Sequence, residues 1–271
     1  MRKFLLYSSV GDLSKFPKYW LSGKGRNFDI WISFYGDRTD HGFEKHVDKY
    51  FVNRNYKFPN FYDVYKKHYD IIKKYDAVFL IDDDIIIKTQ QIRLLFQIIM
   101  ELDLWVMQPA FNDKSLMYWE TNRQISNSFM HYTNFVEINT PIFSKYALEK
   151  FMAVYDPELL STGIDFWCTR TLGIDVKDKY AVIDAITCEN PTNLKKTGTE
   201  TKNREIHKYI SETTKFNSWD IVSKKHGIEK FVPKIYKTVP IDNLKNMIPE
   251  NTKLFSKIMR QFERNTQQSD I

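Results

Sequence analysis

Cysteine is scarce in this sequence, and long apolar runs are absent. Cys168 and Cys188 are the only cysteines among 271 residues, too few for a disulfide framework or a zinc cage. No stretch reaches the roughly 18 uninterrupted apolar residues of a membrane-spanning helix, and the apolar part of "MRKFLLYSSVGD" is short for a signal peptide. Because free thiols suit a reducing compartment, we expect a cytoplasmic protein.

Internal repeats are also absent, and the six histidines show no metal-ligand spacing. In contrast, 42% of the residues are hydrophobic and 15% are aromatic, which is enough for a sizeable buried core. These proportions exclude an intrinsically disordered protein and allow one large domain or two.

Charge is distributed unevenly along the chain. From Thr201 onward there are fourteen Lys and Arg against eight Asp and Glu, a difference that equals the whole net charge of +6. We therefore predict a neutral domain over residues 1–200 and a basic, mainly helical extension over residues 201–271.

Residues 252–264, "TKLFSKIMRQFER", have the pattern of an amphipathic helix, with apolar residues on one stripe and basic residues beside it. Such a helix either packs on the body of the protein or lies on an anionic membrane surface. Packing is the commoner outcome, and peripheral membrane contact stays open. No nucleic-acid-binding motif accompanies the basic charge, so a nucleic-acid partner is not expected.

In the first half, short apolar runs alternate with helical patterns. Thr89 stands where it could cap the second of two amphipathic helices. Strands separated by helices predict an α/β fold with a mostly parallel sheet and helices on both faces. The predicted strands are 3–11, 28–37 and 76–84, and the predicted helices are 61–75 and 89–104.

The second half is less regular. Residues 135–143 are expected to form a strand that leads into a helix from Ser144. Residues 161–173 are expected to form a loop that enters a helix, and residues 180–187 a further strand.

Polar residues follow the first three predicted strands. In a parallel sheet, ligands collect at the carboxyl ends of the strands, so these residues are predicted to face one crevice. Backbone and side-chain groups at Ser8, Ser9, Asp37 and Arg38 are candidates for holding the base and ribose of a nucleotide. Lys57, which precedes "FPN", is a candidate contact for a diphosphate.

Three adjacent carboxylates, Asp82, Asp83 and Asp84, end the third strand. They repel one another, and the repulsion is poorly screened unless a cation or a donor-rich ligand neutralises it. Two carboxylates spaced Asp-x-Asp can hold Mn²⁺ or Mg²⁺ and leave positions for a diphosphate. This is the DXD arrangement of glycosyltransferases that use nucleotide sugars, although Asp pairs also follow strands in phosphatases, nucleases and solvated turns.

A haloacid-dehalogenase-like phosphotransferase is the nearest chemical alternative. It also places Asp-x-Asp after a strand, with the first Asp as nucleophile and the second as acid and base. Against it, Ile86 stands where that motif has a small hydroxyl residue or Val, and the motif normally follows an earlier strand.

Several segments together carry a resemblance to a known family. The sequence is similar to a family of GT-A-type glycosyltransferases long known only as a domain of unknown function. The resemblance spans about residues 3–195 and implies a GT-A-like fold, a nucleotide-diphospho-sugar donor and a glycan or lipid-linked acceptor. Its segments are "KFPNFYDVYKK", "YDAVFLIDDDI", "HYTNFVEINTPIFS" and "GIDFWCTR".

The resemblance also implies roles for the three aspartates. Asp82 and Asp84 would take the metal ion and the donor diphosphate, and Asp83 would lie near the ribose or the sugar. Enzymes of this type often supply a further His ligand after the last core strand, where this chain has Cys188 and Glu189. Glu189 is an oxygen ligand suited to Mn²⁺ or Mg²⁺. A catalytically silent protein that binds a nucleotide or a sugar is the alternative.

Inverting sugar transfer needs a base that takes the proton of the acceptor hydroxyl. Asp165 is the first candidate, because it follows Gly163 in "STGIDFWC" and would lie in a first helical turn, which favours a negative charge. A helix-capping role is its structural alternative. Glu137, in the predicted strand "FVEIN", is the second candidate as base or acceptor ligand, since a charged residue in an apolar strand usually has a partner.

Overall fold

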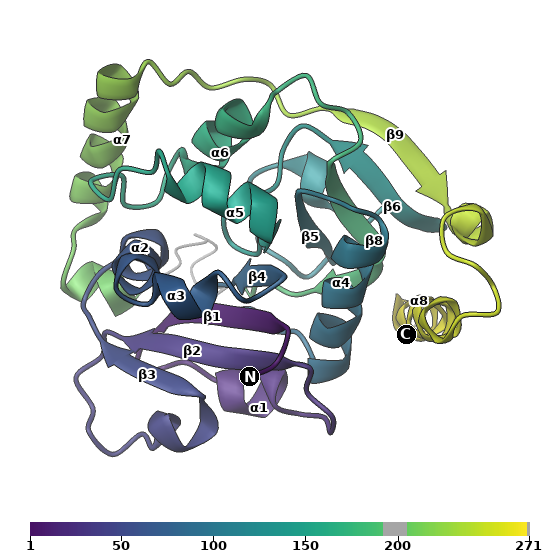
Figure 1. The fold of residues 1–271 in the computed structure, drawn as a ribbon, viewed down its shortest axis with the longest axis horizontal. Helices are drawn as coiled ribbons and strands as arrows, with labels where there is room; N and C mark the ends of the chain where they lie inside the picture. Colours follow the sequence, from purple (N-terminus) through teal and green to yellow (C-terminus); the bar gives the residue numbers. More distant parts are fainter. Residues whose placement is uncertain (192–204, 270–271) are drawn as a thin grey trace, which may run out of the picture.

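The computed structural model describes residues 1–191 and 205–269, and one nine-stranded sheet runs through its centre (Figure 1). The strand order is β3-β2-β1-β4-β7-β5-β8-β6-β9. The strands are β1 (Phe4–Val10), β2 (Phe28–Phe34), β3 (Lys49–Val52), β4 (Ala77–Leu80), β5 (Val106–Phe111), β6 (Ser128–Thr133), β7 (Ile142–Ser144), β8 (Tyr180–Cys188) and β9 (Ile235–Pro240).

The sheet is mostly parallel. β1 pairs in parallel with β2 and β4, β2 pairs in parallel with β3, and β5 pairs in parallel with β8. The remaining pairings are antiparallel and involve β6 or β7. Consequently β6 and β7 run against the other strands, and the predicted α/β architecture with a mostly parallel sheet is confirmed.

Helices cover both faces of this sheet. Leu6 packs in a core with residues of α1, α4 and α8, whereas the adjacent Leu5 packs in a second core with residues of α2, α5 and α6. The alternation follows from strand geometry, because successive side chains point to opposite faces. The α-helices are α1 (Phe16–Trp20), α2 (Lys57–Lys67), α3 (Tyr69–Ile72), α4 (Thr89–Glu101), α5 (Lys145–Met152), α6 (Ile164–Leu172), α7 (Glu212–His226) and α8 (Lys253–Ser269).

Short 3-10 helices connect several of these elements, at η1 (Phe43–His46), η2 (Glu120–Asn122), η3 (Glu205–Lys208) and η4 (Ile241–Asn246). Both cysteines are free and buried, as expected for this composition.

Two predicted helices differ in detail from the observed ones. The pattern over 61–75 is divided, because α2 ends at Lys67 and α3 starts after His68. Thr89 is the first residue of α4 and not its cap: the Lys88 N–H donates to the Gln91 side chain at 2.9 Å. The Thr89 hydroxyl instead donates to the Trp20 carbonyl at 2.7 Å, which ties α4 to α1.

The strand predicted over 135–143 is mostly a loop. Only its end forms β7, and the loop before it bonds to the end of β4, where the Leu80 N–H donates to the Pro141 carbonyl at 3.0 Å. Proline lacks an N–H and therefore interrupts a ladder at this point. The helix expected from Ser144 is confirmed as α5, since the Ser144 hydroxyl accepts a bond from the Ala147 N–H at 3.3 Å.

The C-terminal segment contains a strand as well as helices. β9 pairs with β6 at one edge of the sheet, and in Figure 1 the yellow helix α8 lies beside α4 and β8. In α8, Ile258 is fully buried, and the rest of the apolar stripe packs against the same core, namely Leu254, Phe255, Met259 and Phe262. The apolar stripe of α8 therefore packs against the core of the protein. The boundary predicted at residue 200 lies outside the described residues.

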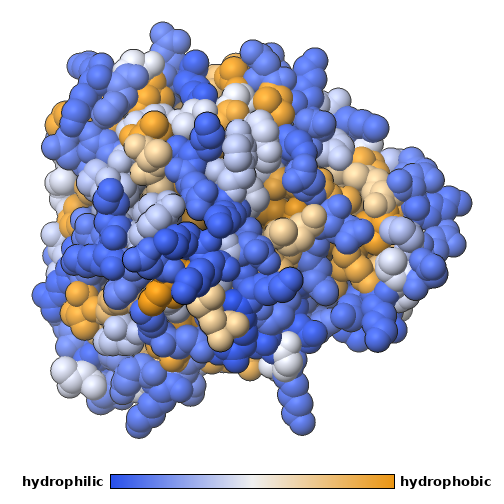
Figure 2. All heavy atoms as spheres, in the orientation of Figure 1, coloured by the Kyte–Doolittle hydropathy of each residue, from blue (hydrophilic) through white to orange (hydrophobic). Residues whose placement is uncertain are grey.

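The visible surface is mostly hydrophilic. Figure 2 shows apolar atoms in separate patches on this face, including one toward the right of the view between β9 and α8. Among residues 1–191 and 205–269, no helix combines the length and the apolar character that crossing a membrane requires.

Candidate functional site

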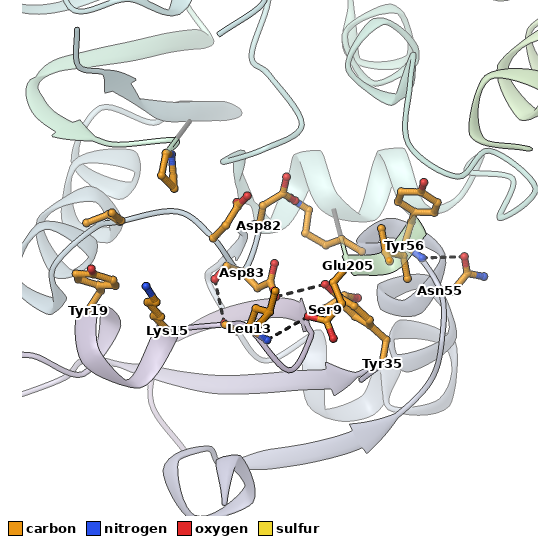
Figure 3. Close-up of a pocket in the computed structure, with 16 residues that line it drawn as sticks. Ser9, Leu13, Lys15, Tyr19, Tyr35, Asn55, Tyr56, Asp82, Asp83 and Glu205 are labelled. Carbon is orange, nitrogen blue, oxygen red and sulfur yellow. Dashed lines mark hydrogen bonds and ion pairs between the residues drawn. The ribbon is translucent and has the colours of Figure 1, made fainter. Parts of the chain in front are cut away.

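A cavity of about 410 Å³ opens beyond the carboxyl ends of β1 and β4 (Figure 3). The chain passes from β1 to β2 and β3 on one side and then returns to β4 on the other side of β1. Ligands of open α/β sheets bind at such a reversal of strand order. Polar and aromatic residues dominate the lining, which includes Ser9, Leu13, Ser14, Lys15, Tyr19, Tyr35, Asn55, Tyr56, Lys57, Asp82, Asp83, Asp84 and Glu205.

The segment Asp82–Asp84 is anchored by the apolar residues that follow it. Ile85 and Ile87 are buried in the core, which explains why the apolar run resumes directly after the carboxylates. Between them, the Ile86 N–H donates to the carbonyl of Glu189 at 2.9 Å. The three carboxylates are thereby held in the wall of the cavity.

Asp83 shows the repulsion that the sequence predicted. Burial raises the pKa of Asp83 to about 7, and the carboxylates of Asp84, Asp82 and Glu205 act in the same direction. The Gly11 N–H donates to Asp83 Oδ2 at 2.9 Å and opposes the shift. Near neutral pH, Asp83 is therefore divided between its protonated and charged forms.

Lys57 is the buried counter-charge of Asp82. Its Nζ lies 2.7 Å from Asp82 Oδ1 and also donates to the carbonyls of Leu80, Ile138 and Asn139, at 3.1, 2.6 and 3.2 Å. A buried ammonium group needs such partners. The geometry gives Lys57 a positioning role, and the predicted diphosphate contact would require it to leave these groups.

The three predicted metal ligands are not all brought together. Asp82 and Asp84 line the cavity, whereas Glu189 is joined to Ile86 through main-chain bonds and does not line it. Within the described ranges 1–191 and 205–269, no three His, Cys, Asp or Glu side chains form a group that could hold a metal ion. The negative charge suits a divalent cation, but the metal site stays a prediction.

Ser9 reaches the cavity and Ser8 does not. The Ser9 hydroxyl accepts a bond from Asn60 Nδ2 at 2.9 Å. Ser8 is fully buried on the other face of the sheet, as the alternation of strand side chains requires.

Asp37 and Arg38 lie outside the cavity lining. Their N–H groups both donate to the Asp12 carboxylate at 3.1 Å, and Asp37 forms an exposed ion pair with Arg54 at 2.6 Å. The predicted crevice is therefore present at the ends of β1 and β4, and the segment after β2 contributes Tyr35 to it instead.

Asp165 lies in the first turn of α6, as predicted, but in a packed region. It is 8% exposed and borders a void of about 10 Å³, which is lined mainly by apolar side chains. Gly163, with φ of 92°, precedes the helix, and a Cβ there would overlap the Trp219 ring. Burial raises the pKa of Asp165 to about 7, although the Phe166 N–H donates to its carboxyl group at 2.9 Å.

Glu137 lies in the loop before β7 and not in a strand. Its carboxylate accepts bonds from Asn122 Nδ2 at 3.1 Å and Asn139 Nδ2 at 2.9 Å, and its N–H donates to Gln108 Oε1 at 2.6 Å. The expectation that this buried charge has partners is confirmed. Because the Asn139 carbonyl accepts bonds from both Lys57 and the Asp82 N–H, Glu137 supports the loop behind the carboxylates.

Several cavity residues escaped sequence reasoning. Glu205 lies in η3, and no local sequence pattern marks it, because its partner Asp12 is 193 residues away along the chain. Lys15 and Tyr35 follow strand ends but resemble ordinary surface residues in sequence. The sequence predicted a ligand contact at Ser8 and Ser9 but carried no signal for the contact between the turn after β1 and Glu205.

The fold has known counterparts among solved structures. A crystal structure of TarS from S. aureus matches with a TM-score of 0.51 and 10% identity, covering 97% of this chain and 43% of that chain. This chain thus spans less than half of that TarS chain. A structure of TarS 1-349 matches with a TM-score of 0.49 and 11% identity, covering 84% and 74% of the two chains. The predicted GT-A-like fold is confirmed.

Sequence comparison assigns the chain to a family. No curated protein sequence matches this chain. One family matches residues 60–226, which is more than half of the 271 residues. The chain therefore belongs to the family described as protein of unknown function (DUF707).

Proposed function

We propose that this protein is a glycosyltransferase that moves a sugar from a nucleotide-diphosphate donor to a hydroxyl group of a glycan or lipid-linked acceptor. The observation that carries the proposal is the cavity at the strand-order reversal of a GT-A-like sheet, with Asp82, Asp83 and Asp84 in its wall. Its volume of about 410 Å³ suits a small-molecule ligand.

The chain offers groups for each part of such a donor. Tyr19, Tyr35 and Tyr56 provide aromatic surface on which a base or a sugar ring can pack. Ser9 offers a hydroxyl group, and Lys15 offers a positive charge at the cavity. These features support binding of a ligand that combines rings with anionic groups.

A diphosphate would be repelled by the carboxylates unless a cation lay between them. Mn²⁺ or Mg²⁺, when bound, would supply that charge. Asp82 and Asp84 are available at the cavity, but Asp82 is already paired with Lys57, and the described residues supply no set of three ligands. We therefore assign no step of the reaction to a metal ion, and metal dependence is a separate prediction.

Proton removal from the acceptor has two candidate groups. Asp165 has a pKa of about 7, which suits proton transfer near neutral pH, but it lies outside the cavity lining. Glu137 is held by two amide groups. Asp165 remains the first candidate for the base.

A catalytically silent nucleotide- or sugar-binding protein is the second candidate function. The pairing of Asp82 with Lys57 and the incomplete ligand set favour it. The phosphotransferase alternative places a covalent phosphate on Asp82, and the position of this residue after β4, not after an early strand, argues against it.

The deciding experiment incubates the protein with a panel of nucleotide sugars, with and without Mn²⁺, and measures nucleoside diphosphate release and thermal stability. UDP-GlcNAc is the first donor to test, because TarS 1-349 has been crystallised with it. A transferase both binds and releases the diphosphate, whereas a silent protein is stabilised by a ligand without releasing it. An acyl phosphate trapped on Asp82 would instead establish the phosphotransferase.

We also propose a cytoplasmic location, with peripheral membrane contact if the acceptor is lipid-linked. The apolar stripe of α8 is packed, so such contact would use its exposed basic residues, Lys253, Arg260 and Arg264.

A further inference from the structure

The turn that follows β1 presents three successive main-chain N–H groups to carboxylates of the cavity. The Gly11 N–H donates to Asp83 Oδ2 at 2.9 Å. The Asp12 N–H donates to Glu205 Oε1 at 3.0 Å, and the Leu13 N–H donates to Glu205 Oε2 at 3.1 Å. Both oxygens of one carboxylate are therefore bound by two adjacent N–H groups, and Figure 3 marks the bond between Leu13 and Glu205 with a dashed line.

Glu205 occupies this place at an electrostatic cost. It is 9% exposed and adds its charge to a cavity wall that already holds three aspartates. Its carboxylate is among the charges that raise the pKa of Asp83, after burial, Asp84 and Asp82. The two N–H groups select an oxyanion, because a carboxylate offers two acceptor oxygens whereas an amide side chain offers only one.

The turn is shaped for a close approach by an oxygen ligand. A Cβ at Gly11 would lie 2.5 Å from Glu205 Oε2 and 2.7 Å from Cζ of Tyr35, so a larger residue would displace the carboxylate. Main-chain N–H groups in a turn form a concavity that binds anions. Lys15, two residues beyond the turn, lines the same cavity and adds a positive charge.

We propose that the N–H groups of Asp12 and Leu13 form an oxyanion-binding subsite of the cavity, and that the Glu205 carboxylate is an internal occupant which a phosphate group of the ligand displaces. The assignment of that phosphate to a nucleotide donor rests on the proposed function. Glu205 thus acts as an autoinhibitory contact: it keeps the subsite filled in the free protein and lowers the affinity for the ligand.

Binding of inorganic pyrophosphate and of UDP to the full chain, measured by calorimetry, tests this proposal. Glu205→Ala removes the occupant and is expected to bind pyrophosphate at least fivefold more tightly than the wild type. Glu205→Gln removes the charge but keeps a carbonyl acceptor for one N–H, so its affinity should lie between the two. Glu212→Ala, which removes an exposed carboxylate on α7, is the matched control and should leave the affinity unchanged.

Equal or weaker pyrophosphate binding by both Glu205 variants would overturn the proposal and leave Glu205 as a structural tether. Thermal melting of Glu205→Gln, which retains the size of the side chain, shows that the comparison is made on folded protein. Tighter binding without any turnover of nucleotide sugars would support the subsite and remove the transferase proposal. Turnover of nucleotide sugars by the wild type without tighter pyrophosphate binding by the variants would support the transferase proposal and overturn the subsite.

Discussion

Two regions of this molecule each hold a carboxyl group whose pKa is raised to about 7, and they differ in what surrounds it. Asp83 borders a cavity of about 410 Å³ together with other carboxylates, and a main-chain N–H holds it in place. Asp165 borders a void of about 10 Å³ among apolar side chains. Burial is the first cause of the shift in both.

The comparison teaches that a perturbed pKa does not by itself mark a ligand site. A void of about 10 Å³ has room for roughly one water molecule. Only the Asp83 region combines perturbed charge with space, with several charged neighbours and with the strand ends at which ligands of such sheets bind. The predictions below test whether the two regions differ in function as they do in structure.

The largest effect is expected from Lys57→Met in the cavity wall. The substitution removes the buried partner of Asp82 and the bonds that Lys57 donates to three carbonyl groups, so the free energy of unfolding should fall by ~3–5 kcal/mol. Urea denaturation followed by tryptophan fluorescence measures it. The double variant Lys57→Met with Asp82→Asn should recover part of the lost stability, because the charge of Asp82 is then no longer unpaired. If the losses of the two single variants simply add in the double variant, the two side chains act independently.

The packed region is tested by Asp165→Asn at two pH values. Because the folded-state pKa of about 7 lies above the ordinary value, the folded wild type binds the proton more tightly, and its stability falls as pH rises from about 4 to about 7. The loss is at most ~1.4 kcal/mol per pH unit. The variant should lack this decline and be more stable than the wild type at pH 8, by urea denaturation.

The same variant tests the catalytic role. If Asp165 is the base, sugar transfer at saturating donor should fall by roughly a hundredfold while donor affinity is kept. Full transfer activity in Asp165→Asn would remove it from the mechanism and make Glu137 the first candidate.

Asp84→Asn should weaken Mn²⁺-dependent donor binding by about tenfold or more while changing stability by less than ~1 kcal/mol, because the shape of the side chain is kept and a ligand charge is lost. Calorimetry with UDP-GlcNAc, with and without Mn²⁺, measures the effect. Asp113→Asn, at an exposed ion pair with Arg123, is the control. An unchanged Mn²⁺ dependence in Asp84→Asn would place the metal site elsewhere.

The smallest effect is expected at Asp156, which lines neither the cavity at Asp83 nor the void at Asp165. Burial by itself would raise the pKa of Asp156, but hydrogen bonds from Lys225 and His226 outweigh burial and lower this pKa to about 2. Its stabilising contribution is therefore present above pH ~4 and lost as pH falls through about 2. Asp156→Asn should cost less than ~1 kcal/mol at pH 7, since Lys225 is half exposed. A loss that persists equally at pH 2 would show that charge is not its cause.

The repeating pattern of the sequence predicted several strands of the parallel part of the sheet, but not β3 or β5. Strands β1, β2 and β4, helix α4 and the start of α5 have local signals, because buried strands are continuous apolar runs and helices carry an apolar stripe. The loop before β7 was misread as a strand, since its apolar residues are buried by packing that a local pattern does not reveal.

The sequence by itself determined that three carboxylates stand together at the end of a buried strand, because their spacing and the apolar residues around them are local properties. Tertiary structure decided which of their neighbours matter. Lys57 became the partner of Asp82, Asp165 was placed in a packed region, and Glu205 was brought to the turn after β1 from 193 residues away. The physical reason is that charge interactions and cavity space depend on distance in three dimensions, which the order of residues along the chain does not specify.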